Sequence, residues 1–222
     1  MDGTGTLFAQ FIEALPQGFE AVPVSYPEDR PLSYPGIVEH IRKRLPGPEP
    51  FALLAESFSA PLAIQIAATR PAGMSALILA AGFATNPSYP WLPGLGALLL
   101  AGRMRLRLPD LVIRRALLGP GASRGLVESV RSAVLSMSPE VFSSRLRSIS
   151  SCDARAELAR VSVPALYLQA ANDRVVPARC LDEILAIRPD VTVARIDGPH
   201  LLLQREPRQA AEIVTDFIRQ LP

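Results

Sequence analysis

Strand-like and helix-like segments alternate along most of this chain. Short apolar runs, several of them rich in β-branched residues, are followed by segments whose apolar residues recur every three or four positions. Such alternation is typical of a mostly parallel sheet that is covered by helices on both faces. The predicted strands are 19–25, 50–56, 75–81, 163–170 and 191–196, and the predicted helices are 7–15, 34–45, 62–68, 177–185 and 210–218.

The segment from 86 to 158 departs from this alternation. It opens with three prolines and continues with leucine-rich helical patterns at about 98–118, 124–135 and 139–149, without any strand pattern. The whole chain has 222 residues, of which 49% are hydrophobic, enough to bury one sizeable core. We therefore expect one core, formed by 1–85 and 159–222, with 86–158 inserted as an all-helical cap. A cap of this kind excludes water from an active site and shapes the substrate pocket.

Ser57 lies where the apolar run 50–56 ends and a helix-like segment with Pro61 near its start begins. Small residues, Ala55 and Ser59, flank it two positions away on each side. This pattern is typical of a nucleophile elbow, a strained turn that pushes the serine hydroxyl out above the sheet and has no room for larger neighbours. Glycine is usual at both flanking positions, so an ordinary strand–helix connection remains an alternative.

A serine hydroxyl becomes a nucleophile when a base takes its proton and an acid orients that base. Of the two histidines, His40 falls among charged residues on a predicted helix, whereas His200 follows a predicted strand and an Asp-Gly-Pro turn. Asp173 also follows a predicted strand. Catalytic groups in α/β sheets lie at such strand ends, so Ser57, Asp173 and His200 form a candidate triad in the order Ser, acid, His. A loop-filling histidine and a helix-capping aspartate are the alternatives.

Four segments of the chain resemble the α/β-hydrolase superfamily, specifically small bacterial serine hydrolases with a helical cap. They are Asp2-Gly3-Thr4-Gly5, the turn around Ser57, Asn172–Pro177 and Gly198-Pro199-His200. The resemblance covers nearly all of the chain. It implies that Ser57 is the nucleophile, that His200 is the general base and then the general acid, and that Asp173 orients His200.

Acyl transfer also needs two backbone N–H donors for the developing oxyanion. Phe58, the residue after the nucleophile, is expected to supply one, and the resemblance places the other on or next to Met1. The strand that leads into this loop in the family is missing from the sequence. In the family it lies between the strands predicted at 19–25 and 50–56. We therefore expect that the native protein begins upstream of Met1, or that these two strands meet directly in an impaired fragment.

The sequence thus predicts a serine hydrolase that cleaves a carboxylic ester or thioester through an acyl-enzyme on Ser57 and that needs neither a metal nor an organic cofactor. Two alternatives stay open. The same triad can transfer the acyl group to an acceptor other than water, or support lyase or haloperoxidase-type chemistry. The scaffold can also serve as a non-catalytic binding module, because a fold does not fix a function.

Composition gives the remaining expectations. The net charge of +2 carries little information about partners, and we expect a small-molecule acyl substrate and no nucleic acid. Cys152 and Cys180 are too few for a disulfide framework and are expected to be reduced thiols. The longest apolar stretch, 92–102, is too short to span a bilayer. No signal-peptide pattern opens the sequence, so we expect a cytoplasmic protein.

Arginines are concentrated in the predicted cap. A basic amphipathic surface there can make a weak contact with an anionic membrane surface or with an acidic acyl carrier. A solvated arginine-rich face over a leucine core is the alternative. The residues concerned are Arg103, Arg105, Arg107, Arg114 and Arg115.

Overall fold

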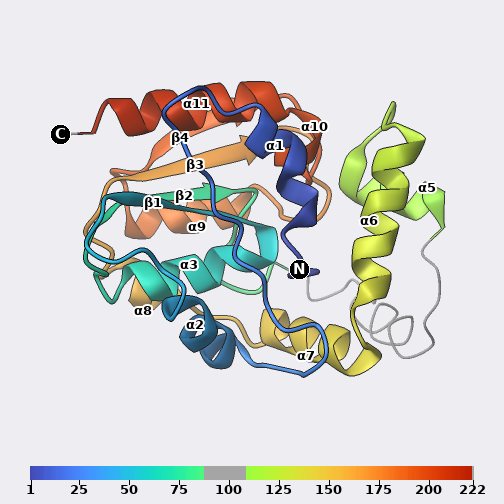
Figure 1. The fold of residues 1–222 in the computed structure, drawn as a ribbon, viewed down its shortest axis with the longest axis horizontal. Coiled ribbons are helices and arrows are strands. Elements are labelled where there is room, and N and C mark those ends of the chain that lie inside the picture. Colours follow the sequence, from blue (N-terminus) through green and yellow to red (C-terminus); the bar gives the residue numbers. More distant parts are fainter. Residues whose placement is uncertain (88–108, 222) are drawn as a thin grey trace.

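A four-stranded parallel sheet lies at the centre of the computed structural model, which describes residues 1–87 and 109–221 (Figure 1). The strands follow the order β1-β2-β3-β4 across the sheet. The predicted α/β class with a mostly parallel sheet is confirmed, and four of the five predicted strands are present. Their bounds are Phe51–Glu56 (β1), Met74–Ala80 (β2), Ala165–Ala170 (β3) and Thr192–Ile196 (β4).

The second strand, β2, shows why the sheet is buried on both sides. Successive side chains of a strand point to opposite faces. Leu77 and Leu79 therefore belong to one hydrophobic core, whereas Ala76 and Ile78 belong to the other. The sequence of such a strand is a continuous apolar run, which is typical of parallel strands with both faces covered. Leu77 pairs with Ala165 of β3, which continues the same core across the sheet.

Helices cover both faces of the sheet. The core of Leu77 is closed by α3, α8 and α9, and the core of Ile78 by α1, α10 and α11. Figure 1 shows α3 and α11 on opposite sides of the strands. The bounds of these and two further elements are Thr6–Phe8 (the 3₁₀-helix η1), Ala9–Glu13 (α1), Tyr34–Arg42 (α2), Ala60–Ala67 (α3), Arg155–Leu158 (α8), Arg179–Ile187 (α9), Leu202–Arg205 (α10) and Pro207–Arg219 (α11).

The described part of the predicted cap is helical. Within 109–158 the structure shows no strand, only an isolated bridge between Thr85 and Asp153. The serines Ser123 and Ser138 begin the two long helices, because each hydroxyl accepts a hydrogen bond from a first-turn N–H group. The division into a core and an inserted cap stays a prediction. The elements are Asp110–Ile113 (α5), the π-helix Arg114–Leu118 (η3), Arg124–Ser136 (α6) and Pro139–Ser150 (α7).

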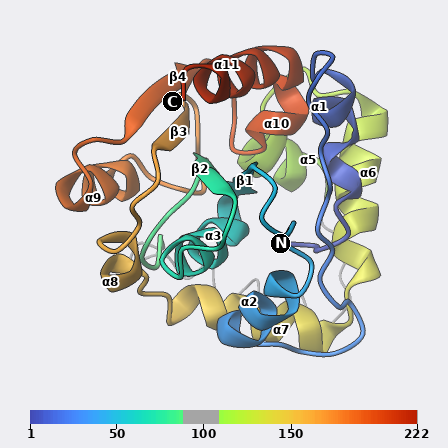
Figure 2. The same ribbon diagram turned by 60° about the vertical axis from the view of Figure 1, so that its left-hand side comes forward.

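Helices α5 and α6 lie at one end of the sheet. In Figure 1 the arrow of β3 points toward the side where they lie, so these two helices face the carboxyl ends of the parallel strands. Helix α7 lies beside α2 in both ribbon views (Figures 1 and 2). The Ser144 hydroxyl of α7 donates a hydrogen bond to the carbonyl of Leu32, which lies just before α2. Part of the predicted helix 98–118 lies outside the described residues.

The prediction of a strand at 19–25 is wrong. This segment is irregular, and its Val22 side chain is 70% exposed. Among the described strands, β1 pairs only with β2, so the segment does not meet β1 directly either. Strand propensity depends on a partner that completes the ladder, and Pro23 has no N–H group to donate. The residue that follows the segment, Tyr26, instead donates its N–H group to the Gly3 carbonyl, at 2.7 Å.

The two cysteines are free and buried, in agreement with the predicted reduced thiols. Burial raises the pKa of Cys152 to about 12 and that of Cys180 to about 11, because the thiolate loses its hydration. None of the helices in the described ranges is long and apolar enough to cross a membrane.

Candidate active site

The turn at Ser57 has the geometry of a nucleophile elbow. Strand β1 ends at Glu56, the 3₁₀-helix η2 covers Ser57–Ser59, and α3 follows at once. The φ angle of Ser57 is 55°, a left-handed conformation that is strained for a residue other than glycine. Ala55 is buried below the turn, and the Ser59 hydroxyl is hydrogen-bonded to the Tyr26 hydroxyl at 2.8 Å. The surrounding structure therefore holds the strained turn in place.

Ser57, His200 and Asp173 are joined by two hydrogen bonds. Ser57 Oγ lies 2.8 Å from His200 Nε2, and His200 Nδ1 lies 2.8 Å from Asp173 Oδ2. The side chains of His200 and Asp173 are 3% and 7% exposed. The three residues follow different strands: Ser57 follows β1, Asp173 follows β3 and His200 follows β4. The structure thus brings together three residues that the sequence analysis selected from distant positions.

Backbone donors fix the carboxylate of Asp173. Its Oδ1 atom accepts hydrogen bonds from the N–H groups of Val175 and Val176, at 2.7 and 2.9 Å. Only Oδ2 then faces His200, whose Nδ1 must carry a proton to donate to it. In this tautomer His200 Nε2 is unprotonated and can accept the proton of the Ser57 hydroxyl. The geometry therefore leaves His200 Nε2 oriented to accept this proton.

A largely apolar cavity of about 320 Å³ opens at Ser57. This volume lies in the range of small-molecule pockets. Ser57 and His200 contribute to the polar part of its lining. The apolar walls come from the amino-terminal segment and from the cap: Leu7, Phe8, Ala116, Leu117, Val130, Ala133, Val134, Phe142, Leu146 and Ile149. The cap helices thus enclose the space in front of the candidate nucleophile.

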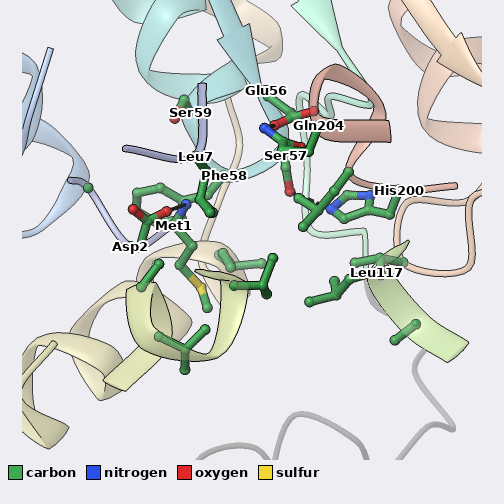
Figure 3. Close-up of a pocket in the computed structure, with 18 of the residues that line it drawn as sticks. Met1, Asp2, Leu7, Glu56, Ser57, Phe58, Ser59, Leu117, His200 and Gln204 are labelled. Carbon is green, nitrogen blue, oxygen red and sulfur yellow. Dashed lines mark hydrogen bonds and ion pairs between the residues drawn. The ribbon is translucent and has the colours of Figure 1, made fainter. Parts of the chain in front are cut away.

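Phe58 and Met1, the two predicted oxyanion positions, both line this cavity. In the view of Figure 3, Ser57 lies between His200 on one side and Met1 and Phe58 on the other. Phe58 stands at the start of a helical turn, where backbone N–H groups have no acceptor within the helix. Its role and that of Met1 in binding an oxyanion stay predictions.

No protein-family model matches the chain. It is 27% identical over 198 residues to the biotin biosynthesis bifunctional protein BioHC of Cellvibrio japonicus. That match covers 86% of the chain but 39% of BioHC, so the chain spans less than half the length of this curated relative.

Solved structures share this fold. An esterase from Exiguobacterium antarcticum superposes with a TM-score of 0.84 at 16% identity, covering 97% of this chain and 88% of the esterase. A bromoperoxidase from Bacillus anthracis gives 0.80 at 16% identity, with the same coverage of 97% and 88%. The chain has the α/β-hydrolase fold. At these identities the likeness concerns the fold, and the activities belong to those two proteins.

The α/β-hydrolase scaffold here carries a buried arginine that the sequence analysis missed. Arg145 of α7 is 2% exposed and donates hydrogen bonds to the carbonyl oxygens of Met1, Asp2 and Pro27. Its guanidinium also lies 5.7 Å from the centre of the Tyr26 ring. Backbone carbonyls therefore satisfy the donors of a buried cation. A single arginine among the many in the cap gave no sequence signal, because its burial depends on tertiary packing.

Glu56 is a second buried charged residue that the sequence analysis did not select. It precedes Ser57, lines the cavity and is 6% exposed. Burial raises the pKa of its carboxyl group, although hydrogen bonds from Leu203 and Gln204 and the proximity of His200 act in the opposite direction. A charged residue at the last position of an apolar strand was the available sequence signal.

The expected basic cap surface has no support in the described residues. Arg103, Arg105 and Arg107 lie outside them. Arg114 donates a hydrogen bond to the Ala122 carbonyl within the cap, and Arg115 is exposed. Across 1–87 and 109–221, no group of three or more His, Cys, Asp and Glu side chains is placed to hold a metal ion.

Proposed function

We propose that this protein hydrolyses carboxylic esters or thioesters through an acyl-enzyme on Ser57. The observation that carries the proposal is the pair of 2.8 Å hydrogen bonds that joins Ser57, His200 and Asp173 beside an apolar cavity. A nucleophile, a base and an orienting acid in this arrangement are the requirements for nucleophilic acyl transfer. The likeness in fold to an esterase agrees with this chemistry.

In the first half of the reaction, Ser57 Oγ attacks the carbonyl carbon while its proton passes to His200 Nε2. Asp173 then stabilises the imidazolium through the Nδ1–H group, and the N–H groups at Phe58 and the Met1 segment stabilise the oxyanion. Collapse of the tetrahedral intermediate breaks the bond to the leaving oxygen or sulfur. The proton on His200 Nε2 goes to this leaving group, and the acyl group stays on Ser57.

The second half repeats these steps with water. His200 Nε2 takes a proton from the water molecule as its oxygen attacks the acyl carbon. The second tetrahedral intermediate then releases the carboxylic acid, and the proton returns to Ser57 Oγ. The atoms balance without a further reactant, since one water molecule is consumed for each ester or thioester cleaved.

The acyl group is proposed to occupy the part of the cavity between the amino-terminal segment and α6 and α7. Its walls there are side chains such as Leu7, Val130 and Leu146. Each buried methylene contributes about 0.8 kcal/mol, which corresponds to roughly a fourfold rise in kcat/KM. A neutral aliphatic acyl group therefore suits this space, and kcat/KM should rise with acyl length until the cavity is full.

The function is tested with p-nitrophenyl esters of increasing acyl length at neutral pH. We expect turnover and, after rapid acid quenching, a mass increase equal to the acyl group on the peptide that contains Ser57. Added alcohol separates hydrolysis from acyl transfer, because a transferase would form the new ester in preference to the acid. Absence of both turnover and adduct for the whole series would leave the binding-module alternative.

Ala133→Phe should shorten the preferred acyl chain. Ala133 lies on α6, is 5% exposed and lines the cavity, so a phenyl ring there takes up space that a long acyl group needs. We expect kcat/KM for p-nitrophenyl octanoate to fall roughly tenfold or more, the value of about two buried methylenes. The acetate ester should change less than about threefold.

Ser132→Phe is the matched control. Ser132 is the adjacent residue of the same helix but is exposed, so the same ring there points away from the cavity and should leave the chain-length profile unchanged. Equal profiles for Ala133→Phe and the unmodified protein would show that the acyl group binds elsewhere.

A further inference from the structure

Glu56 connects the nucleophile elbow to the segment that carries His200. Its Oε1 atom accepts a hydrogen bond from the Leu203 N–H group at 3.1 Å, and its Oε2 atom accepts one from Gln204 Nε2 at 2.9 Å. Leu203 and Gln204 follow His200 by three and four residues. One buried carboxyl group, directly before Ser57, therefore bonds to two adjacent residues of α10, the Leu203 backbone and the Gln204 side chain.

Helix α10 receives one of its first-turn hydrogen bonds from this contact. It has only four residues. Its N-cap residue is Leu201, whose side chain has no acceptor for the N–H groups of the first turn. Such groups need an acceptor from elsewhere. Glu56, 147 positions away, supplies it for the Leu203 N–H group. His200 comes immediately before the N-cap of this helix, so a shift of α10 would move the imidazole.

Gln204 provides a second, incomplete link. Its side chain is 3% exposed and donates to Glu56 through Nε2. Its Oε1 atom is buried and has no hydrogen-bond partner among the described residues. An unsatisfied buried acceptor costs free energy, so the sequence tolerates a local penalty here while it keeps the bond to Glu56.

We propose that Glu56 is a positioning residue, which holds His200 at hydrogen-bond distance from Ser57 by fixing α10 to the nucleophile elbow through Leu203 and Gln204. This inference rests on the proposed function. It assigns the effect to hydrogen bonding by the Glu56 side chain and not to its charge. Misplacement of a catalytic group by about 1 Å can reduce a rate roughly 100-fold, so loss of this link should be measurable.

The test compares Glu56→Leu with Glu56→Gln. Leucine removes both acceptors. Glutamine keeps one oxygen for the Leu203 N–H group, and its NH₂ group can donate to Gln204 Oε1 once that amide rotates. We expect Glu56→Leu to lower kcat roughly 10- to 100-fold with KM changed less than about threefold, and Glu56→Gln to keep kcat within about threefold. Glu212→Gln, the same exchange on the exposed face of α11, is the control for the amide substitution.

A second readout needs no substrate. The downfield proton resonance of the His200–Asp173 hydrogen bond reports the position of the imidazole. It should broaden or shift in Glu56→Leu and persist in Glu56→Gln. A failure of the proposed function would therefore appear as an inactive unmodified protein, whereas the positioning role could still be read from this resonance.

Two results would overturn the inference. The first is a folded Glu56→Leu variant with unchanged kcat and an unchanged resonance. The second is equal impairment of both Glu56 variants, which would assign the effect to charge. If Glu56→Leu does not fold, Gln204→Met removes only one of the two links. We then expect kcat to fall roughly 3- to 10-fold, a fraction of the effect of full misplacement. An unaltered kcat for this variant would also contradict the inference.

Discussion

Ser57→Ala is expected to abolish ester hydrolysis and labelling by a fluorophosphonate probe. The substitution removes the proposed nucleophilic atom, and among the described residues no other hydroxyl is bonded to His200 Nε2 as Ser57 is, at 2.8 Å. Loss of a serine nucleophile of this type lowers kcat on the order of 10⁶-fold, and the residual rate comes from substrate binding and oxyanion stabilisation. Alanine accepts the φ angle of 55° no worse than serine does, so the elbow should keep its shape.

The measurement compares probe labelling, p-nitrophenyl ester turnover and the melting temperature of the two forms. Ser129→Ala removes a hydroxyl from an exposed position of α6 and should behave like the unmodified protein in all three. Equal labelling of Ser57→Ala and the unmodified protein, with the fold intact, would refute the assignment of the nucleophile. Loss of labelling together with loss of the melting transition would report unfolding, which the control separates from a chemical effect.

The sheet and the proximity of Ser57, Asp173 and His200 could be predicted because their signals are local in the sequence. Four apolar runs each became a strand, and Ser57, Asp173 and His200 each follow one of them. Parallel strands bring their carboxyl ends to the same edge of a sheet, so residues far apart in sequence meet there without any detailed knowledge of packing. The order Ser, acid, His then restricted the choice to a few polar residues.

Other features depend on tertiary contacts that the sequence does not display. The segment 19–25 has a strand-like composition, but a strand also needs a partner, and the segment is irregular beside the loop of Gly3. Arg145 and Glu56 look like ordinary charged residues in the sequence. Their burial against backbone groups of distant segments becomes visible only in the structure. The sequence therefore indicates the polar groups of the candidate site better than the residues that hold them in place.

Asp173→Asn is expected to lower kcat about 10⁴-fold, the effect of this exchange in a serine–histidine–aspartate triad. The reason lies in the two N–H groups, of Val175 and Val176, that donate to Oδ1. The amide oxygen of asparagine will keep this position, because an NH₂ group there would face two donors. The NH₂ group then points at His200 Nδ1 in place of Oδ2. The imidazole is thereby driven to the tautomer with its proton on Nε2, which cannot accept the proton of Ser57.

Loss of the correct His200 tautomer should give a kinetic pattern that simple destabilisation of the fold would not. Asp173→Asn should fold normally and bind substrate with a KM near that of the unmodified protein, while both acylation and fluorophosphonate labelling become slow. Asp197→Asn is the matched control, since Asp197 is exposed, follows β4 as Asp173 follows β3, and bonds only to the Asn172 side chain in the described structure. A kcat for Asp173→Asn within tenfold of the control would show that His200 takes its orientation from other contacts. The 2.8 Å bond to Asp173 would then be structural and not catalytic.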